Sequence, residues 1–223
     1  MRRVLISTIS LLALTASSAF AADIPRAAPA YKAPAIVAPI FNWTGFYIGI
    51  NGGFGWGTST WSGFGGDADP KGGLIGLTLG YNWQLPGSPW VFGLEGDIDW
   101  SNIHGTFANA LCPTGCEIRN NWLGTGRLRL GYAIDRVLPY VTGGFAVGDI
   151  KATRGGFAGV SSTEFGWTVG AGIEAALAPQ WTAKLEYLYV DLGSNNCSVV
   201  ACGIATNVDF RTHLLRAGLN FRF

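Results

Sequence analysis

Hydrophobic residues occupy every second position in several stretches of this chain, and a period of two is typical of a β-strand. In residues 46–56 the even positions are apolar, whereas most odd positions carry Gly or Asn. Each stretch has about ten residues, the length that a tilted strand needs to cross a bilayer. The pattern predicts eight strands, centred on residues 46–56, 74–83, 90–100, 122–132, 138–148, 165–177, 181–190 and 213–223.

The connections between these stretches alternate between short and long. The segments QLPGSP, AIDR and APQ join strands two and three, four and five, and six and seven. The other four connections, near residues 57–73, 101–121, 151–164 and 191–210, are long and rich in Gly, Ser, Asn and Thr. This alternation is typical of outer-membrane barrels. The sequence therefore predicts an all-β fold: an eight-stranded antiparallel up-and-down transmembrane β-barrel with short periplasmic turns and four long extracellular loops.

Composition agrees with a lipid environment for the apolar faces. Hydrophobic residues make up 48% of the chain and charged residues 13%, compared with about 25% charged residues in a typical soluble domain. Seven of the nine tryptophans fall at or near predicted strand ends, where amphipathic rings favour the headgroup level. A soluble β-sandwich, the alternative, would have to bury these apolar faces. The net charge of +1 does not indicate a nucleic-acid partner.

Residues 1–21 are typical of a cleaved signal peptide, with Arg2 and Arg3 before an apolar stretch and small residues at Ala19 and Ala21. An uncleaved anchor helix is the alternative, but the apolar run contains Ser and Thr and is shorter than the ~20 residues of a full span. Residues 22–42 are rich in Pro and Ala and predict an extended periplasmic tether. Residues 43–223 form the predicted barrel, and the expected location is the cell outer membrane.

Charged residues in the predicted strands lie on the face opposite to the apolar one. Three acids share one face of residues 90–100, and residues 122–132 carry bases on the corresponding face. Balanced charges in a narrow interior favour a closed ion-pair network, whereas a selective channel would show one dominant sign. The predicted network consists of Glu95, Asp97, Asp99, Arg127, Arg129, Glu174, Lys184, Glu186, Arg216 and Arg222.

Four cysteines fall in two of the predicted surface loops. Cys112 and Cys116 belong to the segment CPTGC, and Cys197 and Cys202 belong to CSVVAC. An exported protein favours disulfides, and proximity in sequence favours one pairing within each loop. A four-thiolate metal site across the two loops is the alternative.

No catalytic constellation is evident, so we expect no enzymatic activity and no cofactor. His213 is placed on the lipid face near the outer rim, and Thr212 points to the opposite face. His104 lies close to Thr106 in a loop, where a solvated residue is the simpler interpretation. The segment GGFGWG precedes no predicted helix and is therefore not a nucleotide-binding loop.

Four segments carry a resemblance to a known family: NWTGFYIGINGGFGWG, LPYVTGGFAVGDI, WTVGAGIEAALAPQWTAKLEYLYVDLG and the ending RAGLNFRF. With them the chain resembles the small outer-membrane β-barrel proteins of alphaproteobacteria, related to the OmpA-type eight-stranded barrel. In that family the barrel-assembly machinery reads a C-terminal Phe preceded by apolar residues two positions apart. Leu219, Phe221 and Phe223 match this assembly signal. Haem binding by some relatives is compatible with the resemblance, but no residue of this chain selects it.

These features predict a structural outer-membrane protein that contributes to envelope integrity and displays surface loops for interaction. The alternatives are a narrow porin-like channel for small solutes and a haem-binding or adhesin surface protein. The expected partners are outer-membrane lipids, including lipopolysaccharide, and the barrel-assembly machinery during biogenesis. A cell-wall or host partner is a further expectation, and no nucleic acid is expected.

Overall fold

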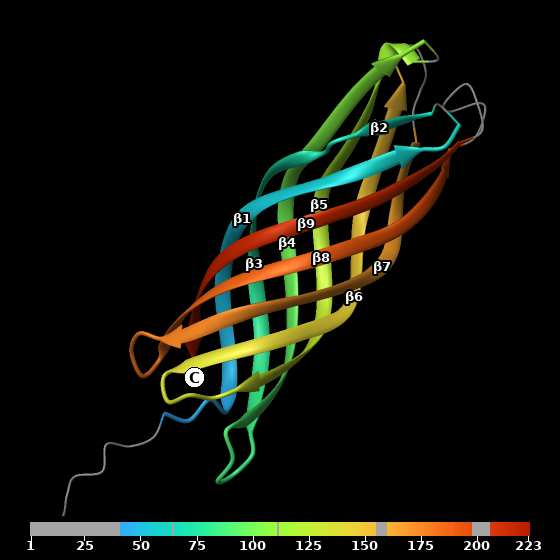
Figure 1. Cartoon of the computed structure of the whole chain (residues 1–223). Helices are drawn as coiled ribbons and strands as arrows, with labels where there is room; N and C mark the ends of the chain where they lie inside the picture. The colour runs from blue at the N-terminus through green and yellow to red at the C-terminus, as the bar shows by residue number, and fades with distance from the viewer. Residues whose placement is uncertain (1–40, 64, 111, 155–159, 198–205) are drawn as a thin grey trace, which may run out of the picture. The chain divides into compact units, whose positions relative to one another are not determined.

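Between Gly45 and Arg222 the described residues form a closed antiparallel β-barrel in the computed structural model, which describes residues 41–63, 65–110, 112–154, 160–197 and 206–223 (Figure 1). The strands are β1 (Gly45–Trp61), β2 (Gly66–Ala68), β3 (Lys71–Gln84), β4 (Trp90–Asn109), β5 (Cys112–Tyr132), β6 (Val137–Arg154), β7 (Val160–Ala176), β8 (Trp181–Cys197) and β9 (Thr206–Arg222). None of the described residues belongs to a helix that is long and apolar enough to cross a membrane.

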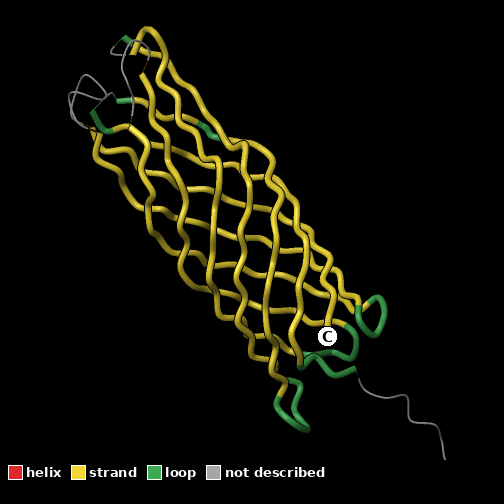
Figure 2. The backbone as a smooth tube through the Cα atoms, turned by 180° about the vertical axis from the view of Figure 1, so that it is seen from behind, coloured by secondary structure: helices red, strands yellow, loops and turns green. Residues whose placement is uncertain are grey.

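Eight of these strands pair in sequence order, and β1 pairs with β9 to close the ring. The register between β1 and β9 runs without a shift from Tyr47 opposite Arg222 to Trp61 opposite Val208. Figure 2 shows the crossing backbone of the two walls from behind. Among the described strands, closure leaves no long unpaired edge, and the predicted eight-stranded barrel is confirmed. The short strand β2 is an addition that pairs with β1 inside the predicted connection 57–73.

The strands are longer than the apolar pattern predicted. β4 and β5 have 20 and 21 residues, and residues 101–109 and 112–121 are strand where a loop was expected. Much of 151–164 and 191–210 also belongs to strands. The predicted strand ends were placed where the outer face becomes polar. Backbone hydrogen bonds between strands do not need apolar side chains, so the strands continue as long as a neighbouring strand pairs with them. A span takes about 9–11 residues, so the barrel wall continues beyond the bilayer on the long-loop side.

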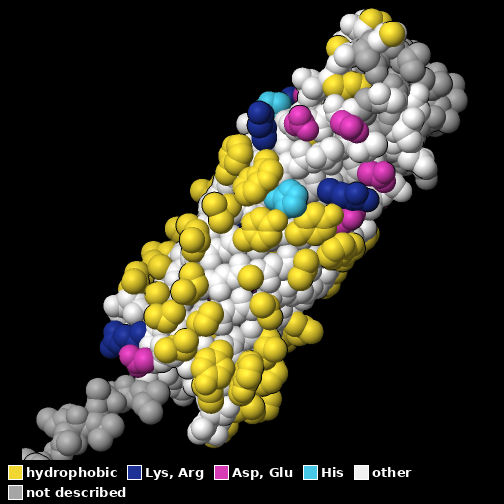
Figure 3. All heavy atoms as spheres, in the orientation of Figure 1, with side chains coloured by type: hydrophobic (Ala, Val, Ile, Leu, Met, Phe, Trp, Pro, Cys, Tyr) yellow, Lys and Arg dark blue, Asp and Glu magenta, His cyan; other side chains and the backbone are white. Residues whose placement is uncertain are grey.

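Side chains alternate between the two faces of the wall as the sequence predicts. In β1, Phe46 and Ile50 are about 60% exposed on the outer face, whereas Tyr47 and Asn51 are buried inside. Hydrophobic side chains form a broad belt on the face of the barrel shown in Figure 3, and charged side chains gather beyond its upper edge. Because lipid solvates apolar groups and water does not, this exposed belt is typical of a membrane-spanning wall.

The C-terminal residues extend the outer face to the short-turn end of the barrel. Phe221 packs edge-to-face against Trp181 and Phe223, and Leu219 is exposed beside them. Their role as an assembly signal stays a prediction. The predicted signal peptide, 1–21, and residues 22–40 of the predicted tether lie outside the described residues.

Candidate functional site

The barrel interior is the candidate site, and its centre is a layer of buried ion pairs. Arg127 on β5 contacts carboxylates from β4 and β8: it forms an ion pair with Glu95, a second with Asp97, and a third with Glu186 at 2.8 Å. Glu95 lies directly opposite Arg127 in the ladder. The alternation of each strand turns both side chains inward, so the pairing follows from sequence parity and strand order.

Arg216 joins strands that are not neighbours in the sheet. Its guanidinium on β9 contacts Asp99 at 2.6 Å and Asp97 at 3.3 Å, both on β4, and Glu186 on β8 at 2.6 Å. β1 and β3 separate β9 from β4 in the ring. Arg216 therefore spans the lumen and links opposite parts of the wall.

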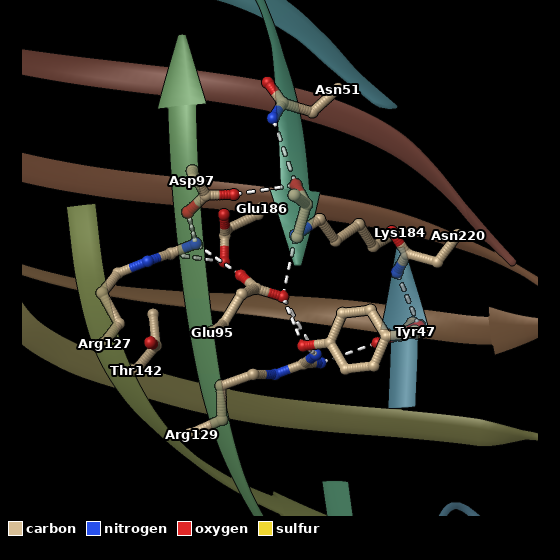
Figure 4. Close-up of polar contacts among 12 residues, drawn as sticks. Tyr47, Asn51, Glu95, Asp97, Arg127, Arg129, Thr142, Lys184, Glu186 and Asn220 are labelled. Carbon is tan, nitrogen blue, oxygen red and sulfur yellow. Dashed lines mark hydrogen bonds and ion pairs between the residues drawn. The ribbon is translucent and has the colours of Figure 1, made fainter. Parts of the chain in front are cut away.

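A second set of pairs lies toward the short-turn end. Arg129 contacts Glu174 at 2.7 Å and Glu95 at 3.2 Å, and the Nζ atom of Lys184 lies 2.9 Å from Glu95. Figure 4 shows the side chains of Glu95, Arg127, Arg129 and Lys184 converging from different strands. Together the buried ion pairs form what we call the charged layer, which consists of Glu95, Asp97, Asp99, Arg127, Arg129, Glu174, Lys184, Glu186 and Arg216.

Uncharged side chains supply further hydrogen bonds to the same carboxylates. Tyr47 donates to Glu95 at 2.7 Å, and Tyr140 donates to Glu186 at 3.1 Å. Thr78 and Thr125 both donate to Asp97 at 2.8 Å. Sequence reasoning missed these residues because it considered only charges on the inward face. Their position in the alternating pattern could have identified them, because Tyr47 lies on the same inward face of β1 as Asn51.

Arg222, expected from its inward position to join the ion-pair network, instead lies at the short-turn mouth. Its guanidinium donates to the carbonyl oxygen of Asn42 at 2.6 Å and lies 4.6 Å from the ring centroid of Phe41. The reason is its position: it is the last residue of β9, level with the segment that enters β1. Arg222 therefore holds the chain entry against the barrel.

That chain entry closes the short-turn end of the lumen. Trp43 is completely buried; its backbone N–H donates to Gln84 at 2.9 Å, and its indole N–H donates to the carbonyl of Asp135 at 3.2 Å. Phe41, from the end of the predicted tether, packs edge-to-face against Trp43, so the last part of that segment also contributes to the barrel mouth. We call this cluster the inner plug; it consists of Phe41, Trp43, Val91, Ala133, Leu138 and Ala176.

The long-loop end of the lumen is filled by apolar side chains. On β8, Lys184 and Glu186 of the charged layer are followed on the same face by Leu188, Val190 and Leu192, all completely buried. We call the cluster the outer apolar layer; it consists of Ala68, Leu74, Ile103, Cys116, Ile118, Leu123, Ala146, Ile150, Ala152, Leu188, Val190, Leu192, Phe210 and Leu214. An eight-stranded barrel has room only for its own side chains, and these three layers occupy it in series.

Three of the four cysteines lie in strands rather than in the expected loops: Cys112 begins β5, Cys116 lies within it, and Cys197 ends β8. Cys116 is disulfide-bonded and is buried in the outer apolar layer. The side chains of Cys112, Cys197 and Cys202 are outside the described part, so the pairing within each segment stays a prediction. No group of three or more His, Cys, Asp or Glu among the described residues is arranged to hold a metal ion.

Both histidines lie on the outer surface. The Nδ1 atom of His213 is 2.6 Å from the Tyr187 hydroxyl, and its ring stacks on Trp56 with centroids 6.0 Å apart. His104 contacts the carbonyl of Asn102 at 3.1 Å, in β4 rather than in a loop. His213 therefore belongs to an aromatic cluster on the outer face with Trp56, Tyr187 and Tyr189.

Sequence reasoning also missed Asp149, a buried acid on the outer side of β6. Its carboxylate accepts hydrogen bonds from the backbone N–H groups of Asn121 and Trp122 at 2.7 and 3.0 Å, and from the Asn121 side-chain amide at 2.6 Å. The β5 register shifts at this point, between Arg119 and Leu123. Asp149 thus satisfies the N–H groups that this irregularity frees from the ladder.

Known proteins share this architecture over nearly the whole chain. The 31 kDa outer-membrane immunogenic protein of Brucella melitensis is 39% identical, with 96% of this chain and 97% of that protein covered. The 22 kDa outer membrane protein of Rhizobium leguminosarum is 34% identical, with 86% and 83% covered. Among solved structures, Neisserial surface protein A is similar at a TM-score of 0.50 and 19% identity, covering 81% of this chain and 98% of that one.

OprG from Pseudomonas aeruginosa is similar at the same TM-score of 0.50, with 15% identity and coverage of 83% of this chain and all of that one. At these identities the two solved structures support the fold alone. The family model described as the outer membrane protein beta-barrel domain matches residues 9–223. With the closed barrel, its exposed apolar belt and these relatives, the chain belongs to the outer membrane protein β-barrel family and is a protein of the cell outer membrane.

Proposed function

We propose that this protein is a closed structural barrel that strengthens the envelope and displays its long-loop end for surface interactions. The observation that carries the proposal is the filling of the lumen by three layers in series. The inner plug, the charged layer and the outer apolar layer leave their central side chains with almost no solvent exposure. A conducting pore needs a continuous hydrated path, and apolar constrictions oppose one.

The charged layer supports a structural role over a transport role. A buried ion is costly unless its partners stay in place, and Arg127 and Arg216 each contact three carboxylates. Passage of a solute would have to separate several of these pairs together. Their geometry instead links β4, β5, β8 and β9, which resists deformation of the wall.

Planar-bilayer recording of the purified protein tests this proposal. We expect no unit conductance steps from protein whose insertion is verified by protease protection in matched liposomes, with a known porin as the positive control. Reproducible steps would favour the narrow-channel alternative. A Leu188→Trp variant would then show whether the steps pass through the lumen, because a bulkier side chain in the outer apolar layer must change the step size.

Surface display is supported by the relatives, which are named as outer-membrane immunogenic proteins. An epitope tag inserted after Ala110, at the turn between β4 and β5, should bind antibody on intact cells. A matched tag after Gly87, in the turn between β3 and β4, should bind only after permeabilisation. Equal labelling of both tags on intact cells would contradict this orientation.

A further inference from the structure

Basic residues form a row across four adjacent strands on the outer face of the long-loop half. Lys71 on β3 lies opposite His104 on β4, His104 lies opposite Arg119 on β5, and Arg119 lies opposite Lys151 on β6. All four side chains are exposed. Neighbouring strands are about 4.8 Å apart, so the row spans roughly 15 Å around the barrel. We call these four residues the basic row.

The basic row lies just beyond the aromatic edge of the lipid-facing belt. Ile75 and Trp100, four positions nearer the membrane than Lys71 and His104, form a cross-strand row with Trp122, which is three positions from Arg119 because the register shifts there. Four residues of strand correspond to roughly 13 Å. Because tryptophan marks the headgroup level and Trp56 on β1 lies directly opposite Lys71, the basic row begins at that level and continues above it. The long loops lie on this side, so the leaflet concerned is the outer one.

Within the described part of the chain, two of the three permanent cations, Lys71 and Lys151, form no ion pair with an acid. Arg119 contacts Glu117 at 2.8 Å, but both side chains are more than a third exposed, and such pairs contribute little. A phosphate could therefore replace Glu117 at low cost.

The nearby Asp149 does not neutralise the row. It lies two residues from Lys151 on the same face of β6, but its carboxylate is directed into β5 by the hydrogen bonds from Asn121 and Trp122. Those donors satisfy the acid and hold it away from Lys151. The cationic groups thus remain available at the surface while the acid maintains the local shape of the wall.

A hollow of about 240 Å³ opens at one end of the basic row. It is lined by Glu117, Arg119, Asn121, Lys151 and Thr153. Two cations, an amide and a hydroxyl around one hollow are a donor-rich set suited to a phosphate, whose oxygens accept hydrogen bonds from each of them.

We propose that the basic row is a docking site for the phosphorylated headgroup of an outer-leaflet lipid, with the acyl chains on the apolar belt below. Charge complementarity and continuity with the lipid-facing surface select this occupant: a headgroup phosphate lies at the level of the row, and its chains need the adjoining apolar face. Lys71, Arg119 and Lys151 supply the charge, and Asn121 and Thr153 supply hydrogen bonds at the hollow. This site is independent of whether the lumen conducts.

Titration of the detergent-solubilised full chain with diphosphoryl lipid A, followed by native mass spectrometry, tests the site. Each basic residue near an anionic headgroup contributes a factor of about five, so the triple variant Lys71→Gln, Arg119→Gln, Lys151→Gln should raise the Kd roughly 100-fold. Two matched controls should leave the Kd unchanged: Arg211→Gln, at the same end but on β9, outside the four strands of the basic row, and Arg136→Gln, at a short turn.

The single variant Lys151→Gln keeps the test informative if the triple variant folds poorly, and it should raise the Kd about fivefold. Fully dephosphorylated lipid A should bind the wild type no better than it binds the triple variant. Wild-type affinity in the triple variant, or equal binding of both lipid forms, would overturn the proposal. Silent bilayer recordings would leave this result untouched, so the two proposals fail separately.

Discussion

The charged layer and the outer apolar layer fill the same lumen in opposite ways. In the charged layer, Arg127 and Arg216 bridge strands by directional contacts to defined carboxylates. In the outer apolar layer, side chains such as Leu188 and Phe210 fill space without fixed partners. The ion pairs of the charged layer therefore determine which strands face one another across the lumen. In the outer apolar layer, one apolar side chain can replace another if the volume is kept.

Position along the barrel explains why the two layers differ. The charged layer lies inside the part of the wall that carries the apolar belt, where interior charges cannot disturb the lipid face. The outer apolar layer begins level with the long-loop edge of the belt, where Leu74 and Leu214 adjoin the exposed Ile75 and Leu215, and it continues where the wall extends beyond the bilayer and faces water outside. There the interior can be stabilised by the hydrophobic effect, as in a soluble barrel.

The largest expected effect comes from breaking the charged layer at one of its two most connected cations. Arg216→Met nearly preserves volume, but it removes the cation beside Asp99 and one of the two cations beside Asp97 and Glu186. A buried Asp99 left without a cation, together with the weakened pairing of the other two acids, should lower the free energy of unfolding by about 3–5 kcal/mol. Urea unfolding in detergent micelles measures this change. An unchanged midpoint would mean that water or neighbouring cations already satisfy the three acids.

A cavity in the outer apolar layer should cost somewhat less. Leu188→Ala removes a completely buried side chain, and we expect a loss of about 2–4 kcal/mol. Leu188→Met is the matched control and should cost less than about 1.5 kcal/mol, because it keeps the volume. A small loss of stability for Leu188→Met and a large loss for Arg216→Met would show that the outer apolar layer depends on filled volume, whereas the charged layer depends on specific ion pairs. Equal losses for the two Leu188 variants would contradict it.

A smaller effect is expected where hydrogen bonds of the charged layer are removed without changing its charge. Tyr47→Phe deletes the hydroxyl that donates to Glu95 at 2.7 Å and accepts a hydrogen bond from Arg129 at 2.9 Å. A hydrogen bond to a charged group contributes about 1.5–3 kcal/mol, and Arg127 and Lys184 remain beside the same carboxylate. We therefore expect a loss near the lower end, measured in the same urea titration. A loss as large as that of Arg216→Met would show that the tyrosine, not the cations, organises the layer.

The smallest effect on stability is expected from a substitution on the exposed outer face of the barrel wall. Arg119→Gln removes an ion pair with Glu117 in which both side chains are exposed. Such pairs contribute about 0–1 kcal/mol, so the unfolding midpoint should stay almost constant. A stable protein with weakened lipid A binding would separate the basic row from the interior layers. Marked destabilisation would instead assign Arg119 a structural role.

Much of the charged layer was predictable from inward parity, but Arg222 and Tyr47 show the limits of that reasoning. The alternation along a strand shows that both side chains point into the barrel. It does not show their position along the barrel axis relative to residues on other strands. Arg222 lies level with Asn42 and therefore binds the chain entry, whereas Tyr47 lies near Glu95 and joins the charged layer. The position along the barrel axis depends on the stagger between neighbouring strands, and this stagger is a property of the closed sheet.

The sequence alone specifies the eight crossing segments and the face of each residue in them, because alternation with a period of two is a local property of the backbone. The tertiary structure sets the rest. It extends the strands past the apolar belt through ladder pairing, brings Arg216 on β9 to Asp99 on β4, and aligns Lys71, Arg119 and Lys151 in one row. These relations join residues on different strands, so they depend on register and closure, which no single strand encodes.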